Sequence, residues 1–278
     1  MNNIVFGQYY PTNSVVHRLD ARVKLLLVIA YIVTVFFCED FSMYGALFLF
    51  VVIAALVSKI PLKVLFRTVR TVVFLVLITS AINLFFTNGE HLLWGWRFIK
   101  IYAEGVERAI KLAVRLILLM LFPALLTLTT TPMELTDAIE SLLAPLKLIK
   151  VPVHAIALIM SIALRMIPIL VEETNKIMLA QKARGASFDT GGPFKKAKAM
   201  VPVLVPLFVG AFRRADELAL AMDARCYSSV ATRTKYRVMQ LHFRDLVAAV
   251  ICLALFSLVF LNKYLFPFDA WIVGLFRR

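Results

Sequence analysis

This sequence has few acidic side chains and no recognisable catalytic motif. Its 278 residues include 17 Asp and Glu against 31 Lys and Arg, which gives a formal net charge of +14. It contains no GxxxxGK[ST] phosphate-binding loop, no HExxH zinc motif, no GxSxG nucleophile motif and no paired Asp-rich motif. The chain therefore does not bind ATP through a P-loop. A membrane prenyltransferase or an intramembrane protease would have no residues to carry its reaction.

Cysteine and histidine are also sparse. There are three cysteines and four histidines, and they form neither a CxxC pair nor a Cys/His cluster with the spacing of metal ligands. We therefore expect no metal, no cofactor held by this chain and no catalytic residue. The cysteines are Cys38, Cys226 and Cys252.

Apolar side chains, in contrast, are abundant. The chain is 61% hydrophobic with a mean hydropathy of +0.84, which is typical of an integral membrane protein. The basic charge then follows from the excess of Lys and Arg on the cytoplasmic side of membrane proteins, and we expect no nucleic acid partner. The first residues are polar and aromatic, unlike a cleavable signal peptide, so the first apolar segment is expected to remain in the protein.

Five apolar segments are predicted to cross the membrane. The N-terminus and residues 59–70 are basic, whereas residues 39–40 are acidic and the loop 87–109 is balanced, which predicts a cytoplasmic N-terminus. Arg115 is expected to snorkel near the outer interface, and Asn83 is expected to hydrogen-bond a neighbouring helix. The predicted spans are 25–38, 41–57, 71–86, 112–130 and 246–266.

Three further helices are predicted at the cytoplasmic face. Thr131 and Glu134 form a helix-start pattern for a helix ending near Leu143. Longer helices are expected over 152–184 and 194–225. The apolar segments 151–171 and 199–212 are not assigned as spans, because a crossing at 199–212 would put one strongly basic segment outside. The predicted fold is an all-α integral membrane protein with membrane helices in 1–130, a cytoplasmic coupling region in 131–240 and a last membrane helix in 241–278.

One short pattern occurs twice at the predicted helix ends. The segments are Ala183-Arg184-Gly185 and Ala224-Arg225-Cys226, and their arginines are 41 positions apart. An arginine fork makes paired bonds to carboxylates and stacks on aromatic rings, and small neighbours let a helix end enter a groove. A single arginine there would be explained by its favourable interaction with a helix C-terminus, about 0.3–1 kcal/mol. Two matched copies favour docking to two similar cytoplasmic proteins.

These motifs carry a resemblance to a known family. The chain resembles the T component of energy-coupling factor (ECF) transporters, an L-shaped transmembrane coupling subunit. Cys226 stands where that family often has glycine, which weighs against a left-handed helix stop there. Further matching segments are Gly7-Gln8-Tyr9, His17-Arg18-Leu19-Asp20, Thr131-Pro132, Pro145-Leu146-Lys147, Leu164-Arg165 and Arg213-Arg214-Ala215.

The resemblance implies a non-catalytic subunit of a vitamin or micronutrient importer in a bacterial or archaeal cell membrane. It implies two cytoplasmic ABC-type ATPases, which bind ATP and Mg²⁺ and each accept one arginine motif. It also implies a membrane-embedded S component that binds the vitamin and packs against the apolar helix starts, 153–170 and 199–212. This subunit would neither hydrolyse ATP nor bind the vitamin.

Other readings of the sequence are a self-contained secondary transporter or channel, a lipid-metabolising membrane enzyme, and an ABC permease that binds its own substrate. A coupled carrier usually needs acids deep in its spans, and the five predicted spans have none in their middles. An enzyme would need a metal or phosphate motif. A typical permease carries one docking motif per chain.

Overall fold

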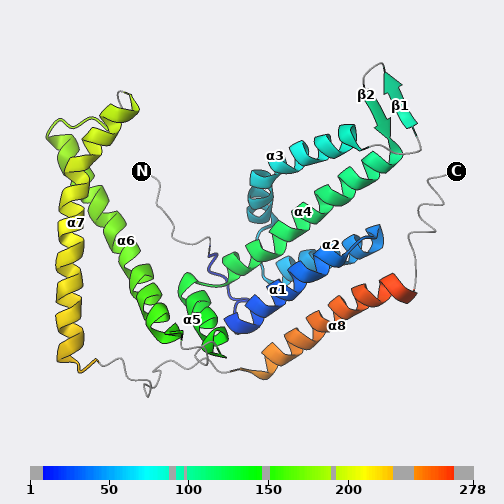
Figure 1. Ribbon diagram of the computed structural model, residues 1–278. Helices are drawn as coiled ribbons and strands as arrows, with labels where there is room; N and C mark the ends of the chain where they lie inside the picture. Colours follow the sequence, from blue (N-terminus) through cyan, green and yellow to red (C-terminus); the bar gives the residue numbers. More distant parts are fainter. Residues whose placement is uncertain are drawn as a thin grey trace. The chain divides into compact units, whose positions relative to one another are not determined.

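The computed structural model describes residues 9–87, 92–96, 99–145, 151–188, 192–227 and 241–265. The chain forms two compact units (Figure 1). The first unit comprises Met1–Ser141 and Met239–Arg278, and the second comprises Leu142–Val238. The sequence-based boundaries at 130 and 240, which were drawn from charge and hydropathy, stay predictions.

Every helix predicted from the sequence is present, and the predicted all-α class is confirmed. The helix Phe41–Val57 has the predicted bounds, whereas α3 and α4 begin nine residues earlier than the apolar segments 71–86 and 112–130. Their first turns carry charged residues, which a hydropathy pattern leaves out. The helices of the first unit are α1 (Ala21–Phe37), α2 (Phe41–Val57), α3 (Leu62–Phe86), α4 (Ala103–Thr129), α5 (Pro132–Leu142) and α8 (Phe243–Leu265).

A short β-hairpin corrects the loop predicted over 87–109. Strand β1 (Leu92–Trp96) pairs antiparallel with β2 (Ile99–Tyr102), directly before α4. Aromatic and β-branched residues favour strands, and this composition outweighs the short length of the segment.

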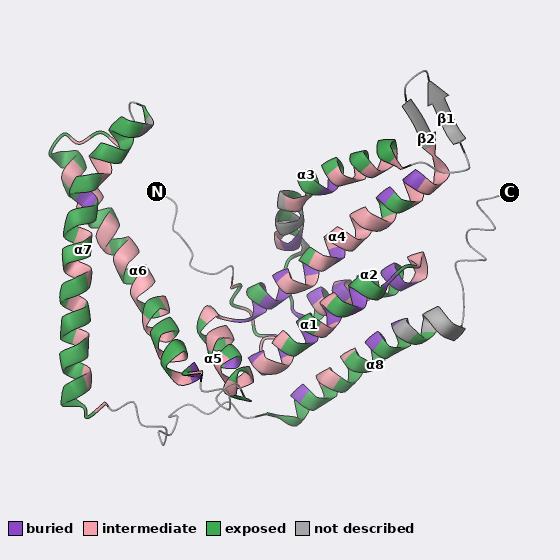
Figure 2. Cartoon of the chain, in the orientation of Figure 1, coloured by how far each residue is buried: buried purple, intermediate pink, exposed green. Residues whose placement is uncertain are grey.

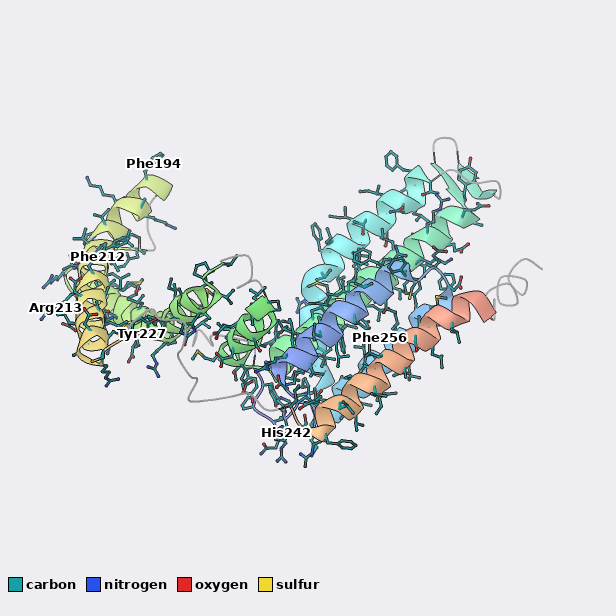
Figure 3. All side chains as sticks on the ribbon, turned by 60° about the horizontal axis from the view of Figure 1, so that its bottom comes forward. Phe194, Phe212, Arg213, Tyr227, His242 and Phe256 are labelled. Carbon is teal, nitrogen blue, oxygen red and sulfur yellow. The ribbon has the colours of Figure 1, made fainter. Side chains whose placement is uncertain are left out.

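The core of the first unit is centred on Tyr31. This side chain is fully buried, and its ring lies 4.5 Å from that of Phe122 and 6.0 Å from that of Phe256. Phe256 is labelled in Figure 3. Phe50 lies 5.4 Å from Phe122 and 5.7 Å from Phe256. The four rings come from α1, α2, α4 and α8, so the last described helix packs into the same core as the first.

The outer faces of these helices are apolar and exposed (Figure 2). Phe36, Phe74 and Phe86 are 60%, 73% and 81% exposed. Soluble proteins rarely expose so much contiguous apolar surface, whereas a lipid bilayer covers it. Among the described residues, α4 and the helix Val153–Ala183 are long and apolar enough to cross a membrane. The division into five spanning helices and three cytoplasmic helices stays a prediction.

Two buried charges join the first turn of α1 to distant segments. Lys24 is 6% exposed, and its Nζ donates to the carbonyl oxygen of Thr129 at 3.1 Å and to Thr130 Oγ1 at 3.3 Å. Asp245 at the start of α8 is 2% exposed, and its carboxylate accepts from the backbone N–H groups of Asp20 and His242, both at 2.8 Å. The starts of α1 and α8 and the end of α4 are therefore held by charge-assisted hydrogen bonds.

The predicted helix start at Thr131 is confirmed. The N–H of Thr131 donates to Glu134 Oε2 at 3.2 Å, and the N–H of Glu134 donates to Thr131 Oγ1 at 3.3 Å. This reciprocal pair is a capping box, and it satisfies two backbone donors that the first turn of α5 leaves free.

Two polar residues in the membrane helices were given specific expectations. Arg115 reaches the end of α1, beside the acidic loop 39–40: its Nη2 donates to the Cys38 carbonyl at 2.7 Å and its Nε donates to the Tyr44 hydroxyl at 2.9 Å. The guanidinium thereby satisfies a carbonyl at the end of α1, where a positive charge is favoured. Asn83 donates to the carbonyl of Thr79 in its own helix at 2.9 Å, rather than to another helix.

The described part of the second unit contains two long helices, α6 (Val153–Ala183) and α7 (Pro193–Ala224). Both agree with the predicted ranges 152–184 and 194–225 to within one residue at each end. Pro193 stands in the first turn of α7, where its missing N–H costs no helical hydrogen bond. Most side chains of both helices are exposed or half-buried, and Val203 is the fully buried exception in the described part of α7 (Figure 2).

Candidate docking site at two helix ends

The end of α6 is built from the first arginine motif. Ala183 is the last helical residue, Arg184 is the C-cap, and Gly185 has a positive φ of 87°. The N–H of Ala186 donates to the carbonyl of Gln181 at 3.0 Å, and the N–H of Gly185 donates to the carbonyl of Lys182 at 3.0 Å. This is the Schellman arrangement, in which a left-handed residue turns the chain back to satisfy the last carbonyls.

The end of α7 repeats this geometry. Arg225 is the C-cap with φ and ψ of −93° and 15°, compared with −85° and 9° for Arg184. The N–H of Tyr227 donates to the carbonyl of Met222 at 3.0 Å, and the N–H of Cys226 donates to that of Asp223 at 2.9 Å. The two sequence motifs therefore form the same local structure.

Cys226 corrects one expectation. The absence of glycine weighed against a left-handed stop, yet Cys226 has a φ of 55°. A side chain in this conformation costs about 1 kcal/mol or more. The two Schellman hydrogen bonds offset this cost, so the helix ends in the same way without glycine.

The six motif residues are all exposed, and neither arginine is held by a described residue. Over the described parts of the chain, the guanidinium groups of Arg184 and Arg225 make no ion pair and no side-chain hydrogen bond. Both forks can therefore bind a partner's carboxylate or aromatic ring. The exposed residues are Ala183, Arg184, Gly185, Ala224, Arg225 and Cys226.

The two helix ends form two separate sites. Arg184 lies at the end of the second unit where α7 begins, and Arg225 lies at the opposite end of α7 (Figure 1). With 32 residues, α7 is about 48 Å long at ~1.5 Å per residue. No single small groove can accept both arginines. Phe194 and Tyr227 mark the two ends of α7 in Figure 3.

An apolar surface covers the middle of α7. Phe208, Val209 and Phe212 are 61%, 63% and 70% exposed, and Phe212 is labelled in Figure 3. The start of α6 is similar, with Ile159 64% exposed and Met160 47% exposed. Surfaces of this kind normally face a partner or lipid.

One ion pair across the two helices was not expected from the sequence. Arg214 Nη2 lies 2.5 Å from Glu173 Oε2 and joins α7 to α6. The sequence offers one indication of this pair. Glu173 and Arg214 are 41 positions apart, which is also the separation of the two motif arginines. Among the described residues, no group of three or more His, Cys, Asp or Glu is placed to hold a metal ion.

The fold and its exposed apolar faces define an all-helical membrane protein. The family model for the cobalt transport protein CbiQ matches residues 12–236. The chain is 45% identical to the "energy-coupling factor transporter transmembrane protein EcfT" of Acidaminococcus fermentans over 267 residues, which cover 96% of this chain and 99% of that protein.

Two further relatives carry the same name. The Lactococcus lactis protein is 44% identical over 257 residues, covering 92% of this chain and 97% of its own length. The Bacillus subtilis protein is 42% identical over 260 residues, covering 94% and 98%. The chain belongs to the CbiQ/EcfT family of ECF transporter transmembrane components, and the resemblance inferred from the sequence is confirmed.

Proposed function

We propose that this chain couples two cytoplasmic ABC-type ATPases to a membrane-embedded S component that carries a vitamin or similar micronutrient. The observation that carries the proposal is the pair of equivalent helix ends, each presenting an exposed arginine between small residues. Two equivalent ends at opposite ends of α7 fit two related partners, one at each end. ATP and Mg²⁺ belong to the ATPases, and this chain contributes no catalytic residue.

The apolar middle of α7 and the apolar start of α6 are assigned to the S component. The exposed apolar surface suits contact with a membrane protein. The charged helix ends next to it suit contact with soluble proteins. Charge supports the proposed orientation. The basic N-terminal segment and the basic residues 59–70 favour a cytoplasmic N-terminus, and the basic segments 176–198 and 213–237 favour the same side for α6 and α7.

Charge reversal of both motif arginines tests the docking. We expect Arg184→Glu with Arg225→Glu to abolish co-purification of the ATPases and vitamin uptake, because each fork loses its bidentate bonds and meets its acidic partner with a like charge. The matched control is Lys195→Glu with Arg213→Glu, two exposed cations on α7 outside the motifs. Full assembly and uptake in the first double variant would overturn the docking proposal.

A further inference from the structure

α6 carries two adjacent acids and α7 carries two adjacent bases. In each case one residue pairs within its own helix and the other pairs with the opposite helix. Glu172 interacts within its own helix with Lys176 at 3.5 Å, whereas Glu173 reaches across to Arg214. In the same way, Arg213 pairs within α7 with Glu217 at 3.2 Å. The helix-internal pairs are 64–81% exposed, whereas the side chains of Glu173 and Arg214 are only 26% and 35% exposed.

The charges on the two helices are inverted copies of one pattern. Two acids followed by a base on α6 correspond, 41 positions later, to two bases followed by an acid on α7. Complementary patterns of this kind specify which surfaces pair and in what register. The two sets are Glu172, Glu173 and Lys176, and Arg213, Arg214 and Glu217.

The cross-helix pair lies at the same distance from each candidate docking end. Arg184 is 11 residues after Glu173, and Arg225 is 11 residues after Arg214. Eleven residues are three turns, or about 16 Å of helix, and return each arginine to nearly the same helix face. The pair therefore divides α6 and α7 so that the two arms leading to the docking ends have equal length.

Gly210 lies against the side chain of Glu173. A Cβ on Gly210, one turn before Arg214, would lie 3.3 Å from Glu173 Oε1. A side chain there would crowd the carboxylate that pairs with Arg214. Val203, two turns earlier on the same helix, is fully buried. Glycine at 210 thus permits the approach that the ion pair needs.

The energetics distinguish this pair from its neighbours. Exposed pairs four residues apart on one helix contribute little to stability and fix no tertiary contact. A half-buried pair between two helices is different, because removal of one partner leaves the other charge partly desolvated and unpaired. Of the ion pairs between described residues of α6 and α7, the Glu173–Arg214 pair is the one that joins the two helices.

We propose that the Glu173–Arg214 ion pair, seated over Gly210, is the pivot that locks α6 to α7 and makes their two arginine-tipped ends move as one rigid piece. Its role in transport rests on the proposed function, whereas the pivot itself is a property of this chain alone. Without the pivot, motion of one docking end would be lost as bending at the crossing and would not reach the other helix.

The distance between the two arms tests the pivot directly. Nitroxide labels at Leu179 and Leu220, which are 54% and 70% exposed, report this distance by pulsed electron resonance on the full chain in nanodiscs. The native cysteines are replaced in all samples. We expect one narrow distance distribution in the parent and, in Arg214→Glu, a broad one in which the parental distance is several-fold less populated.

Two variants make this test specific. The exchanged pair, Glu173→Arg with Arg214→Glu, should restore the narrow distribution, because the attraction is restored with its signs reversed. The neighbouring Arg213→Glu, which breaks only a helix-internal pair, should leave the distribution unchanged. The pivot is refuted if Arg214→Glu leaves the distances unchanged, if Arg213→Glu broadens them equally, or if the exchanged pair does not restore them.

Uptake by the assembled transporter tests the consequence. Arg214→Glu should retain both ATPases and lower uptake about tenfold, and the exchanged pair should recover most of it. Normal uptake with broadened distances would refute the pivot's role in transport. The docking proposal fails independently, if the double variant at Arg184 and Arg225 keeps its ATPases, and the distance measurement does not depend on that result.

Discussion

The buried Lys24 makes a prediction whose sign and size follow from the structure. Burial lowers its pKa from the ordinary 10.5 to about 8, against the attraction of Glu134, Asp20 and Asp245, which raises it. The residue precedes the predicted span 25–38. Because the Nζ donates to the carbonyls of Thr129 and His17, the folded protein keeps this lysine in place in both protonation states.

The sign of the pH effect follows from proton binding. Below pH 8 both the folded and the unfolded chain hold the Lys24 proton, so its contribution to stability is constant. Between about 8 and 10.5 the folded protein releases the proton while the unfolded chain keeps it. Raising the pH through this window therefore stabilises the folded state, by about 1.4 kcal/mol per pH unit and about 3 kcal/mol in total.

The assay is thermal unfolding of the detergent-purified protein from pH 7 to 10.5, followed by circular dichroism. Lys24→Met keeps the length of the side chain and removes the titration, so the unfolding midpoint of the wild type should rise relative to this variant, by on the order of 5–10 °C. Lys63→Met, at an exposed lysine of α3, should run parallel to the wild type. Parallel curves for the wild type and Lys24→Met, or a fall of the wild type relative to that variant, would refute the reasoning.

Two other predictions concern the helix ends. Cys226→Gly should stabilise the protein by about 1 kcal/mol and Gly185→Ala should destabilise it by a similar amount, because only the left-handed strain changes; nothing lies within 4 Å of a Cβ at Gly185. Equal unfolding midpoints for all three proteins would contradict this explanation. In sealed vesicles, the native Cys226 and a cysteine placed at Ser187 should both react with impermeant thiol reagents from the cytoplasmic side only. Labelling from opposite sides would place a membrane span between them and favour a self-contained carrier.

The secondary structure could largely be predicted because its determinants are local. Apolar runs located the membrane helices, and the Thr131–Glu134 pattern located the start of α5. The hairpin before α4 could not be predicted because its two strands have only five and four residues, too few to show a clear periodic pattern. The true starts of α3 and α4 were missed because charged residues occupy their first turns.

Contacts between distant segments could not be predicted in the same way. The expectation for Arg115 named the outer interface but not its partner, the carbonyl at the end of α1, which costs less than exposure to lipid. Lys24 counted only as one of the basic residues before the first span, yet it is buried against the end of α4. Both outcomes depend on which helices become neighbours, and no single-segment pattern contains that information.

The candidate site combines local features, which the sequence predicts, with a contact between distant segments, which it does not. The helix ends at Arg184 and Arg225 are local and follow from the repeated motif, although the left-handed stop at Cys226 does not. The link between the two helices could not be predicted from the motif. On α6, two acids share one nearby lysine, so one carboxylate needs a cation from elsewhere. On α7, however, Glu217 stands three residues after Arg214 and offers it a partner within its own helix. The sequence leaves that choice open, and the packing of α7 against α6 decides it, because the Glu173 side chain lies beside Gly210 and within reach of Arg214.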